Sequence, residues 1–159
     1  MEDWRAVLNR RRIYPIDRGA LFQALTIQNR PYAASDPALS ESLALLAREN
    51  TYTITTGQQT GWLTGPLYTI YKAIAALQLA RRVEKHLGPP YRVVPVFWMA
   101  SEDHDAEEVR WIATRWGKVW RYEGHFQGPV GRHRIENAFP PEVKPLALQA
   151  FYEPGQRWE

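Results

Sequence analysis

The sequence predicts an α/β fold built on a parallel sheet, and three consecutive segments support this prediction. Residues 51–56 are all β-branched or aromatic, which is typical of a strand. Residues 66–87 repeat apolar side chains at helical spacing, and residues 92–100 form an almost continuous apolar run, as in a buried strand. The order strand, helix, strand calls for a right-handed crossover between parallel neighbours. We therefore expect the two strands to lie side by side.

The first 50 residues form a helical lead-in to this core. Asp17 is placed to cap a short helix over residues 19–27. A second helix opens at Ser35 or Asp36, with Pro37 at its first position. The apolar residues that follow at helical spacing are Leu39, Leu43, Leu46 and Ala47. These residue types carry no catalytic signal, so we expect the lead-in to be structural.

The long helix at 66–87 is apolar on nearly all sides, which is typical of a helix covered on two sides. Lys72 lies nearly opposite its main apolar stripe, and Gly88 ends it. A lysine in such surroundings needs a partner or a ligand, because an unpaired buried ammonium loses its proton. The alternative is a lysine whose stem is covered and whose head reaches water. The main stripe consists of Leu67, Ile70, Tyr71, Ile74 and Leu77.

A glycine-rich turn at 57–65 joins the first strand to this helix. Such a turn exposes backbone N–H groups at a helix N-terminus, where the helix dipole favours an anion. Gln58 and Gln59 add amides that both donate and accept, which suits a polyhydroxylated or carboxylated ligand. The glycine spacing fits neither the dinucleotide fingerprint nor the P-loop. The alternative is therefore that these glycines serve only tight turning and close packing.

An acidic segment, residues 101–105, follows the second strand directly. Ligands of open parallel sheets bind beyond the carboxyl ends of the strands. The carboxylates and imidazole of this segment provide acid–base groups and polar ligands. Two alternatives remain: a capping box between Asp105 and Glu108, or a charged loop that is simply solvated. The four candidate residues are Glu102, Asp103, His104 and Asp105.

The turn and the acidic segment should flank one crevice, because both leave the carboxyl ends of neighbouring strands. Lys72 leans back toward the same place, since helical side chains point toward the helix N-terminus. We expect the lysine to lie beside at least one carboxylate. The side chains expected to converge are Gln58, Gln59, Lys72, Glu102, Asp103 and His104.

The remainder of the chain predicts smaller elements. Two short strands are expected at 109–114 and 118–122, followed by a loop at 124–131 and a helical patch at 143–152.

Composition excludes several classes of protein. The net charge of +3 arises from 20 basic and 17 acidic residues, and residues 10–12 are the only basic triplet. This distribution does not favour nucleic-acid binding. No apolar run approaches the roughly 20 residues needed to cross a membrane, and the N-terminus lacks a signal-peptide pattern. With no cysteine, disulfides and thiolate metal sites are excluded, and we expect a cytoplasmic protein.

Three of these stretches, residues 56–61, 64–72 and 96–105, resemble one known family. They are similar to the cysteine-adding enzymes of bacillithiol biosynthesis, the BshC family, with looser agreement at 129–132 and 152–155. The resemblance implies a Rossmann-like core related to nucleotidyltransferases and class I aminoacyl-tRNA synthetases. It also implies condensation of cysteine with glucosaminyl-malate.

The resemblance further implies a site. Catalytic roles fall to Lys72, Glu102, Asp103 and His104. ATP is expected as the activator of the cysteine carboxyl group, because an amide bond requires an activated carboxyl; no metal is expected. The residues implied to bind substrate or nucleotide are Gly57, Gln58, Gln59, Gly61, Thr64, Gly65, Tyr68 and Asp105.

Members of this family are several times longer, with the rest of the core and a coiled-coil arm. We therefore expect residues 51–159 to be a partial core, in an N-terminal fragment or truncated form that associates with itself or with the missing C-terminal part. Two alternatives stay open: a generic nucleotide-binding or nucleotidyltransferase-like domain, and a non-catalytic remnant acting with a separate C-terminal chain.

Overall fold

The computed structural model describes residues 3–61, 65–113 and 119–133. The chain divides into two compact units, one of residues 1–55 and 74–96 and the other of residues 56–73 and 97–159. The predicted division at residue 50 into a helical lead-in and a partial core stays a prediction. The elements in chain order are α1 (Trp4–Arg11), α2 (Arg18–Ala33), α3 (Pro37–Leu46), β1 (Thr51–Gln59), α4 (Leu67–Leu87), β2 (Arg92–Ala100), η2 (Ala106–Glu108), β3 (Trp111–Ala113), β4 (Val119–Arg121) and η3 (Val130–Arg132).

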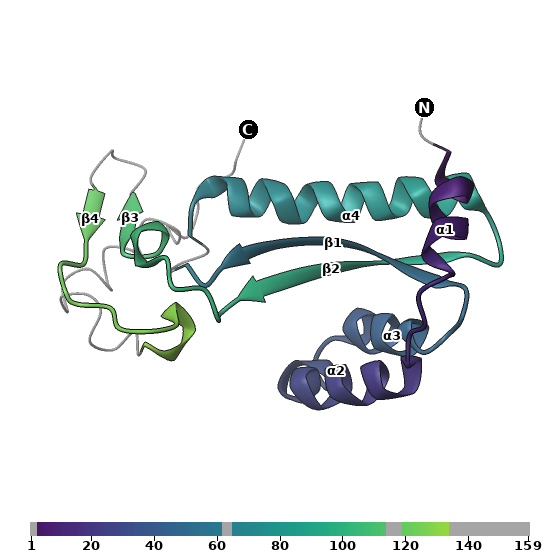
Figure 1. Cartoon of the computed structure of the whole chain (residues 1–159), viewed down its shortest axis with the longest axis horizontal. Helices are drawn as coiled ribbons and strands as arrows, with labels where there is room; N and C mark the ends of the chain where they lie inside the picture. Colours follow the sequence, from purple (N-terminus) through teal and green to yellow (C-terminus); the bar gives the residue numbers. More distant parts are fainter. Residues whose placement is uncertain (1–2, 62–64, 114–118, 134–159) are drawn as a thin grey trace, which may run out of the picture. The chain divides into compact units, whose positions relative to one another are not determined.

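β1 and β2 form a two-stranded sheet and run in the same direction, with α4 as the connection between them (Figure 1). This confirms the predicted parallel pair. β1 is longer than predicted, because Gly57, Gln58 and Gln59 continue the strand rather than opening the turn. Gly57 makes this extension possible: a Cβ at this position would lie 2.8 Å from the carbonyl oxygen of Trp98 on β2. For Gly57, close packing of the strands is therefore the observed role.

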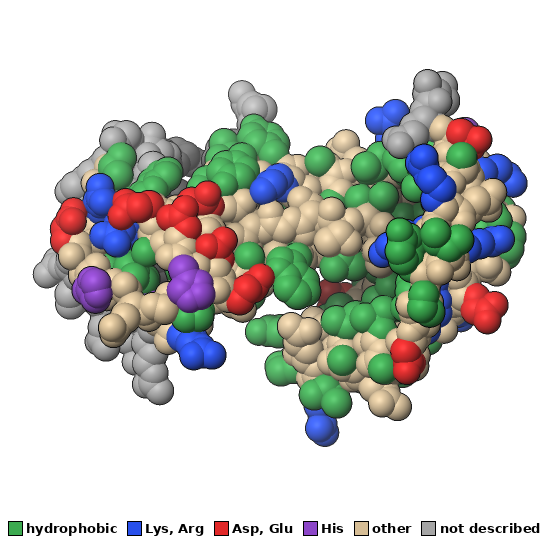
Figure 2. Space-filling model, in the orientation of Figure 1, with side chains coloured by type: hydrophobic (Ala, Val, Ile, Leu, Met, Phe, Trp, Pro, Cys, Tyr) green, Lys and Arg blue, Asp and Glu red, His purple; other side chains and the backbone are tan. Residues whose placement is uncertain are grey.

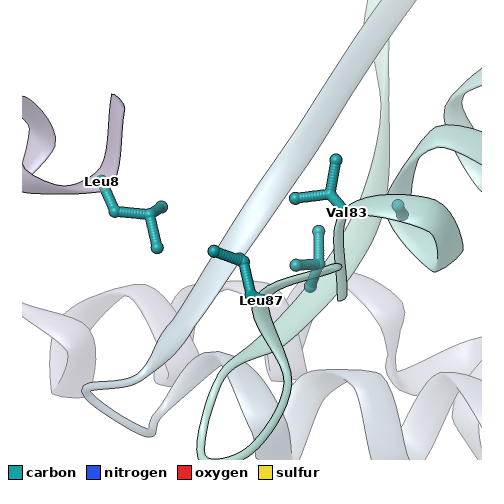
Figure 3. Packing of buried hydrophobic residues seen from close by; sticks show 5 residues of the cluster. Leu8, Val83 and Leu87 are labelled. Carbon is teal, nitrogen blue, oxygen red and sulfur yellow. The ribbon is translucent and has the colours of Figure 1, made fainter. Parts of the chain in front are cut away.

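The first unit has helices on both faces of the sheet, as Figure 1 shows. Adjacent residues of a strand point to opposite faces, and Val93 and Val94 follow this rule. Val93 packs with Ala80, Val83 and Leu87 of α4 and with Leu8 of α1. Figure 3 shows Leu8, Val83 and Leu87 directed toward one another. The other face packs against α3, where Val94 contacts Leu45 and Leu46.

The helical lead-in begins its helices where the sequence predicts. Asp17 caps α2 by accepting from the backbone N–H of Ala20, and Asp36 caps α3 by accepting from Ala38 and Leu39. α2 is longer than the predicted helix and continues through Pro31 into its last turn. A proline this close to the end interrupts few hydrogen bonds, so the helix tolerates it.

α4 ends as predicted, at Gly88, whose φ of 68° is the left-handed conformation that favours glycine. The face that it buries differs from the prediction. The large side chains of the predicted stripe are exposed, with Leu67 and Tyr71 each 63% accessible. The helix is buried instead through Ala76, Ala80, Val83 and Leu87. It is therefore covered on one side by the described residues, not on two.

The second unit contains strands in the two regions where short strands are predicted. β3 and β4 are antiparallel, with Trp111 opposite Arg121 and Ala113 opposite Val119. The predicted loop at 124–131 ends in η3, whose first residues hydrogen-bond to the segment after β2. The predicted helical patch at 143–152 lies outside the described residues. Among the described helices, none combines the length and the apolar character required to cross a membrane.

Candidate functional site

The candidate site lies in the second unit, where β1 and β2 end. β1 brings Gln58 and Gln59 to this place, the first turns of α4 bring Lys72, and the segment 101–108 follows β2. Figure 2 shows acidic side chains gathered on this unit. All the interactions described below are made within this unit.

Lys72 anchors one side of the site. Its Nζ donates to the carbonyl oxygen of Gly57 and to Oε1 of Gln58, each at 2.9 Å. The ammonium also lies 5.1 Å from the ring centroid of Tyr68, one turn earlier on α4, in a cation–π contact. Lys72 is half-buried. Within the described part of the chain, these two hydrogen bonds leave its third N–H available to a ligand.

Gln58 connects the lysine to a carboxylate. Its side chain is buried, and the whole residue is only 8% accessible. While Oε1 accepts from Lys72, Nε2 donates to Oε2 of Glu108 at 2.9 Å. The result is a chain of hydrogen bonds from an ammonium through an amide to a carboxylate. It joins residues from α4, β1 and η2.

Gln59 forms a second link to the same segment. Its side chain hydrogen-bonds to the carboxylate of Asp103. The backbone N–H of Asp105 also donates to Asp103 Oδ1 at 2.9 Å. These two hydrogen bonds, the one from Asp105 first, lower the pKa of Asp103 below its ordinary value, because they stabilise the charged form.

η3 holds the acidic segment in place through two backbone hydrogen bonds. The N–H of Val130 donates to the carbonyl of Asp103 at 2.8 Å, and that of Gly131 donates to the carbonyl of Ser101 at 3.0 Å. A Cβ at position 131 would come within 2.5 Å of the Ser101 Cβ, so this contact requires glycine. This observation gives a structural reason for the sequence pattern at 129–132.

The structure places four of the six side chains expected to converge in two separate pairs, Lys72 with Gln58 and Gln59 with Asp103, and no hydrogen bond among the described residues joins the two pairs. Lys72 has no carboxylate beside it among the described residues; Gln58 lies between it and Glu108. The expected lysine–carboxylate contact is therefore replaced by a bridged one.

The other predicted residues lie around this group. Glu102 is exposed and accepts from Nε1 of Trp98 at 3.3 Å, and His104 is exposed. Asp105 caps η2 by accepting from the N–H of Glu107, which resembles the capping alternative. Gly61 and Gly65 flank residues 62–64, so Thr64 lies outside the described residues.

Glu108 is a member of the site that local sequence signals do not reveal. It lies 50 residues from Gln58, and as a sequence feature it reads only as a capping partner of Asp105. The one available signal is its position three residues after the candidate segment. Only the folded chain shows that it contacts the first strand.

Buried polar atoms at the start of α4 lack partners. Oε1 of Gln59 and the hydroxyl oxygens of Thr60 and Thr69 have no hydrogen-bond partner in the described part of the chain. Such atoms are costly unless a ligand or water satisfies them. The described residues contain no cluster of three or more metal-binding side chains.

Comparison with known proteins shows which family this chain belongs to. Residues 1–142 match the family described as bacillithiol biosynthesis BshC, N-terminal Rossmann-like domain. The chain belongs to this family. The match confirms the Rossmann-like fold that the three sequence motifs imply.

Relatives named as the cysteine ligase BshC align with the same part of the chain. The protein from Flavobacterium johnsoniae is 42% identical over 120 residues, which are 76% of this chain and 22% of the relative. Those from Symbiobacterium thermophilum and Bacillus mycoides are 47% identical over 108 residues and 55% identical over 100 residues, covering 19% and 18% of the relatives. The aligned region thus spans about a fifth of the length of these relatives, and this chain is a member of a ligase family.

Proposed function

We propose that this chain supplies part of the active site of a cysteine ligase that joins cysteine to glucosaminyl-malate in bacillithiol biosynthesis. Membership of the BshC family supports the reaction. The arrangement at the strand ends supports the location, because it places a cation, amides and carboxylates where parallel sheets bind ligands. We propose that the protein acts in the cytoplasm. ATP is available there, and the sequence has no cysteine with which to form the disulfides common outside the cell.

The proposal rests on the hydrogen bonds that Lys72 makes. Two of its three N–H groups are held by Gly57 and Gln58, so the third has a defined place from which to bind an anion. The ligand candidates are a malyl carboxylate or a phosphate. An ammonium held in this way stabilises negative charge more effectively than a mobile one, because its position requires no reorganisation.

The acidic segment completes the proposed site. An amine must lose a proton as it forms an amide, and His104 is an exposed imidazole that can take it. Glu102 and Asp103 provide the charge that attracts the amine of the sugar. In this proposal the amine nitrogen forms the new bond to the cysteine carbonyl carbon while the activating group leaves with the carboxyl oxygen.

ATP is the activator that we propose, and the residues present suit a phosphate. The hydroxyls of Thr60 and Thr69 are buried and without partners among the described residues, and Thr69 lies in the first turn of α4. Helix N-termini favour anions through their free N–H groups and dipole. When bound, ATP would supply a leaving group on the cysteine carboxyl.

Isothermal titration calorimetry tests the proposed substrates. The complete gene product would be titrated with ATP, glucosaminyl-malate and cysteine, separately and together. We expect glucosaminyl-malate to bind and its affinity to fall at least about tenfold in Lys72→Ala, the loss of one charge-assisted hydrogen bond. His104→Ala should bind normally. Binding of ATP alone, unaffected by either other ligand, would favour a generic nucleotide-binding domain instead. Binding of none would favour a remnant that acts with a separate chain.

A further inference from the structure

We propose that Glu108 is a positioning residue of this site, which fixes the orientation of the Gln58 amide and thereby holds the Lys72 ammonium in place. The inference rests on the proposed function only in assuming that Lys72 binds substrate. The positioning itself follows from three side chains and two hydrogen bonds. Nothing in the local sequence around Glu108 assigns it this role.

The chemistry of the two partners determines which way the amide points. An ammonium can only donate hydrogen bonds, and an ionised carboxylate can only accept them. The Gln58 oxygen must therefore face Lys72, and its NH₂ group must face Glu108; each of the two contacts is 2.9 Å long. The reversed amide would place its NH₂ group against the ammonium and its oxygen against the carboxylate. Both contacts would then be repulsive.

Burial makes this orientation consequential. Gln58 is 8% accessible, whereas Glu108 is exposed, so the described contact of the Gln58 NH₂ group is with Glu108 at the edge of the solvent. Without an acceptor at position 108, the NH₂ group would have only water as a partner, and no fixed acceptor would hold the amide with its oxygen toward Lys72. Lys72 would keep the carbonyl of Gly57 and the ring of Tyr68, but these do not fix it in one direction.

The charges around the lysine are consistent with a bridged pair. The carboxylate of Glu108 lies one amide away from Lys72 instead of in direct contact with it. A direct ion pair would occupy the N–H that a ligand needs and would repel an anionic ligand. The amide transmits the orientation from the carboxylate to the ammonium while leaving the cation free to attract an anion. This arrangement suits a substrate-binding lysine.

Three variants of the protein as its gene encodes it test the positioning role. Glu108→Ala removes the acceptor, and we expect KM for glucosaminyl-malate to rise about tenfold or more, with a smaller change in kcat, as for lost binding. Glu108→Gln keeps an acceptor oxygen and should stay within about threefold of wild type. Glu107→Ala is the matched control, since Glu107 lies on the same turn but pairs with Arg110 and Arg121.

An exchange of the two side chains provides a rescue. Gln58→Glu alone sets two carboxylates against each other and should be impaired. Combined with Glu108→Gln, it places the new carboxylate against Lys72 and an amide donor behind it, so the hydrogen-bond chain is restored with reversed roles. We expect the double variant to bind better than Gln58→Glu alone but less well than wild type, because its carboxylate still pairs directly with Lys72.

A second readout is independent of activity. Residues 1–159 contain four lysines, so the side-chain ¹⁵N spectrum of the ammonium groups is simple, and Lys72→Arg assigns one signal. We expect Glu108→Ala to broaden or shift the Lys72 signal, and Glu107→Ala to leave it unchanged. If the wild-type protein makes no product, the proposed function fails, but the spectrum still tests the positioning. An unchanged Lys72 signal in Glu108→Ala, or a double variant no better than Gln58→Glu, overturns the inference.

Discussion

Gly57 shows how one residue sets the spacing of the sheet beside the site. A Cβ at this position would meet the Trp98 carbonyl oxygen at 2.8 Å and the Trp98 Cβ at 3.1 Å, so β1 and β2 would have to separate. We expect Gly57→Ala to lower the free energy of unfolding by about 1–3 kcal/mol, the usual cost of overpacking. Urea denaturation followed by circular dichroism measures this change.

Gly19→Ala is the control, because Gly19 lies in the first turn of α2 and its nearest neighbouring atom, Oδ1 of Asp17, is 3.4 Å from the added Cβ. Alanine favours a helix more than glycine, so this variant should be at least as stable as wild type. Equal stability of Gly57→Ala and wild type would show that the strands do not approach as closely as described.

Asp103 is a second single residue with a testable effect, because its contacts depend on pH. Its pKa in the folded chain lies below the ordinary value of 3.8, first through the N–H of Asp105 and then through Gln59. A lowered folded pKa means that the carboxylate stabilises the segment above the ordinary value and that this contribution is lost as pH falls through the folded pKa. An NMR titration should place the Asp103 pKa below 3.8, and Gln59→Ala should raise it. A wild-type pKa at or above 3.8 contradicts the geometry of this segment.

At the scale of elements, Arg18 ties α2 to the end of α3 and the start of β1. Its guanidinium donates to the carbonyl oxygens of Leu46, Glu49 and Thr51 at 3.1, 3.1 and 2.9 Å. These carbonyls follow a helix end, where backbone acceptors need partners. We expect Arg18→Met to lower the free energy of unfolding by about 1–3 kcal/mol, because it keeps the apolar stem and removes the donors.

Arg30→Met is matched to it, since Arg30 lies on the same helix and its side chain makes no hydrogen bond to the described residues. Thermal unfolding of the two variants should separate them. If the Arg18→Met and Arg30→Met proteins unfold at the same temperature, the three hydrogen bonds contribute nothing measurable to stability.

Elements with strong local signals are predictable, and their limits depend on contacts with distant residues. The caps Asp17 and Asp36 and the end at Gly88 are readable because a cap acts on its own turn. The end of β1 is not, because Gly57 continues the strand only when Trp98 lies alongside. The buried face of α4 also differs from the prediction, because Ala76, Ala80, Val83 and Leu87 are buried rather than the large side chains of the predicted stripe.

The same distinction applies to the site. The parallel order of β1 and β2 places the turn and the acidic segment at one edge, and this follows from the sequence. Which side chains contact one another at this edge does not follow from the sequence. The pairing of Gln58 with Glu108 depends on how residues 101–108 fold after β2, and periodicity carries no information on that.

At the scale of the whole molecule, α4 leaves large apolar side chains uncovered. Figure 2 shows hydrophobic side chains gathered over the beginning of this helix, where Leu67, Tyr68, Ile70 and Tyr71 are exposed. We propose that this face associates with a second copy or with a further part of a BshC polypeptide, since exposed apolar patches mark interfaces.

Sedimentation velocity over a range of concentrations tests this association. We expect the chain to self-associate at micromolar concentrations and Tyr71→Glu to weaken the association at least about tenfold, because a carboxylate is costly to bury. Gln78→Glu, an exposed polar position on the same helix, should associate as wild type does. A stable monomer at all concentrations, with and without the rest of a BshC polypeptide, would contradict the proposal.

The formation of product tests the central claim most directly. The protein as its gene encodes it would be incubated with cysteine, glucosaminyl-malate and ATP, and the cysteine adduct would be quantified by mass spectrometry. We predict that wild type forms the adduct and that Lys72→Ala, with an unchanged circular dichroism spectrum, forms it at least about 100-fold more slowly, as when a preorganised charge is removed. Absence of adduct with wild type, or an equal rate with Lys72→Ala, would contradict a ligase site organised around this lysine.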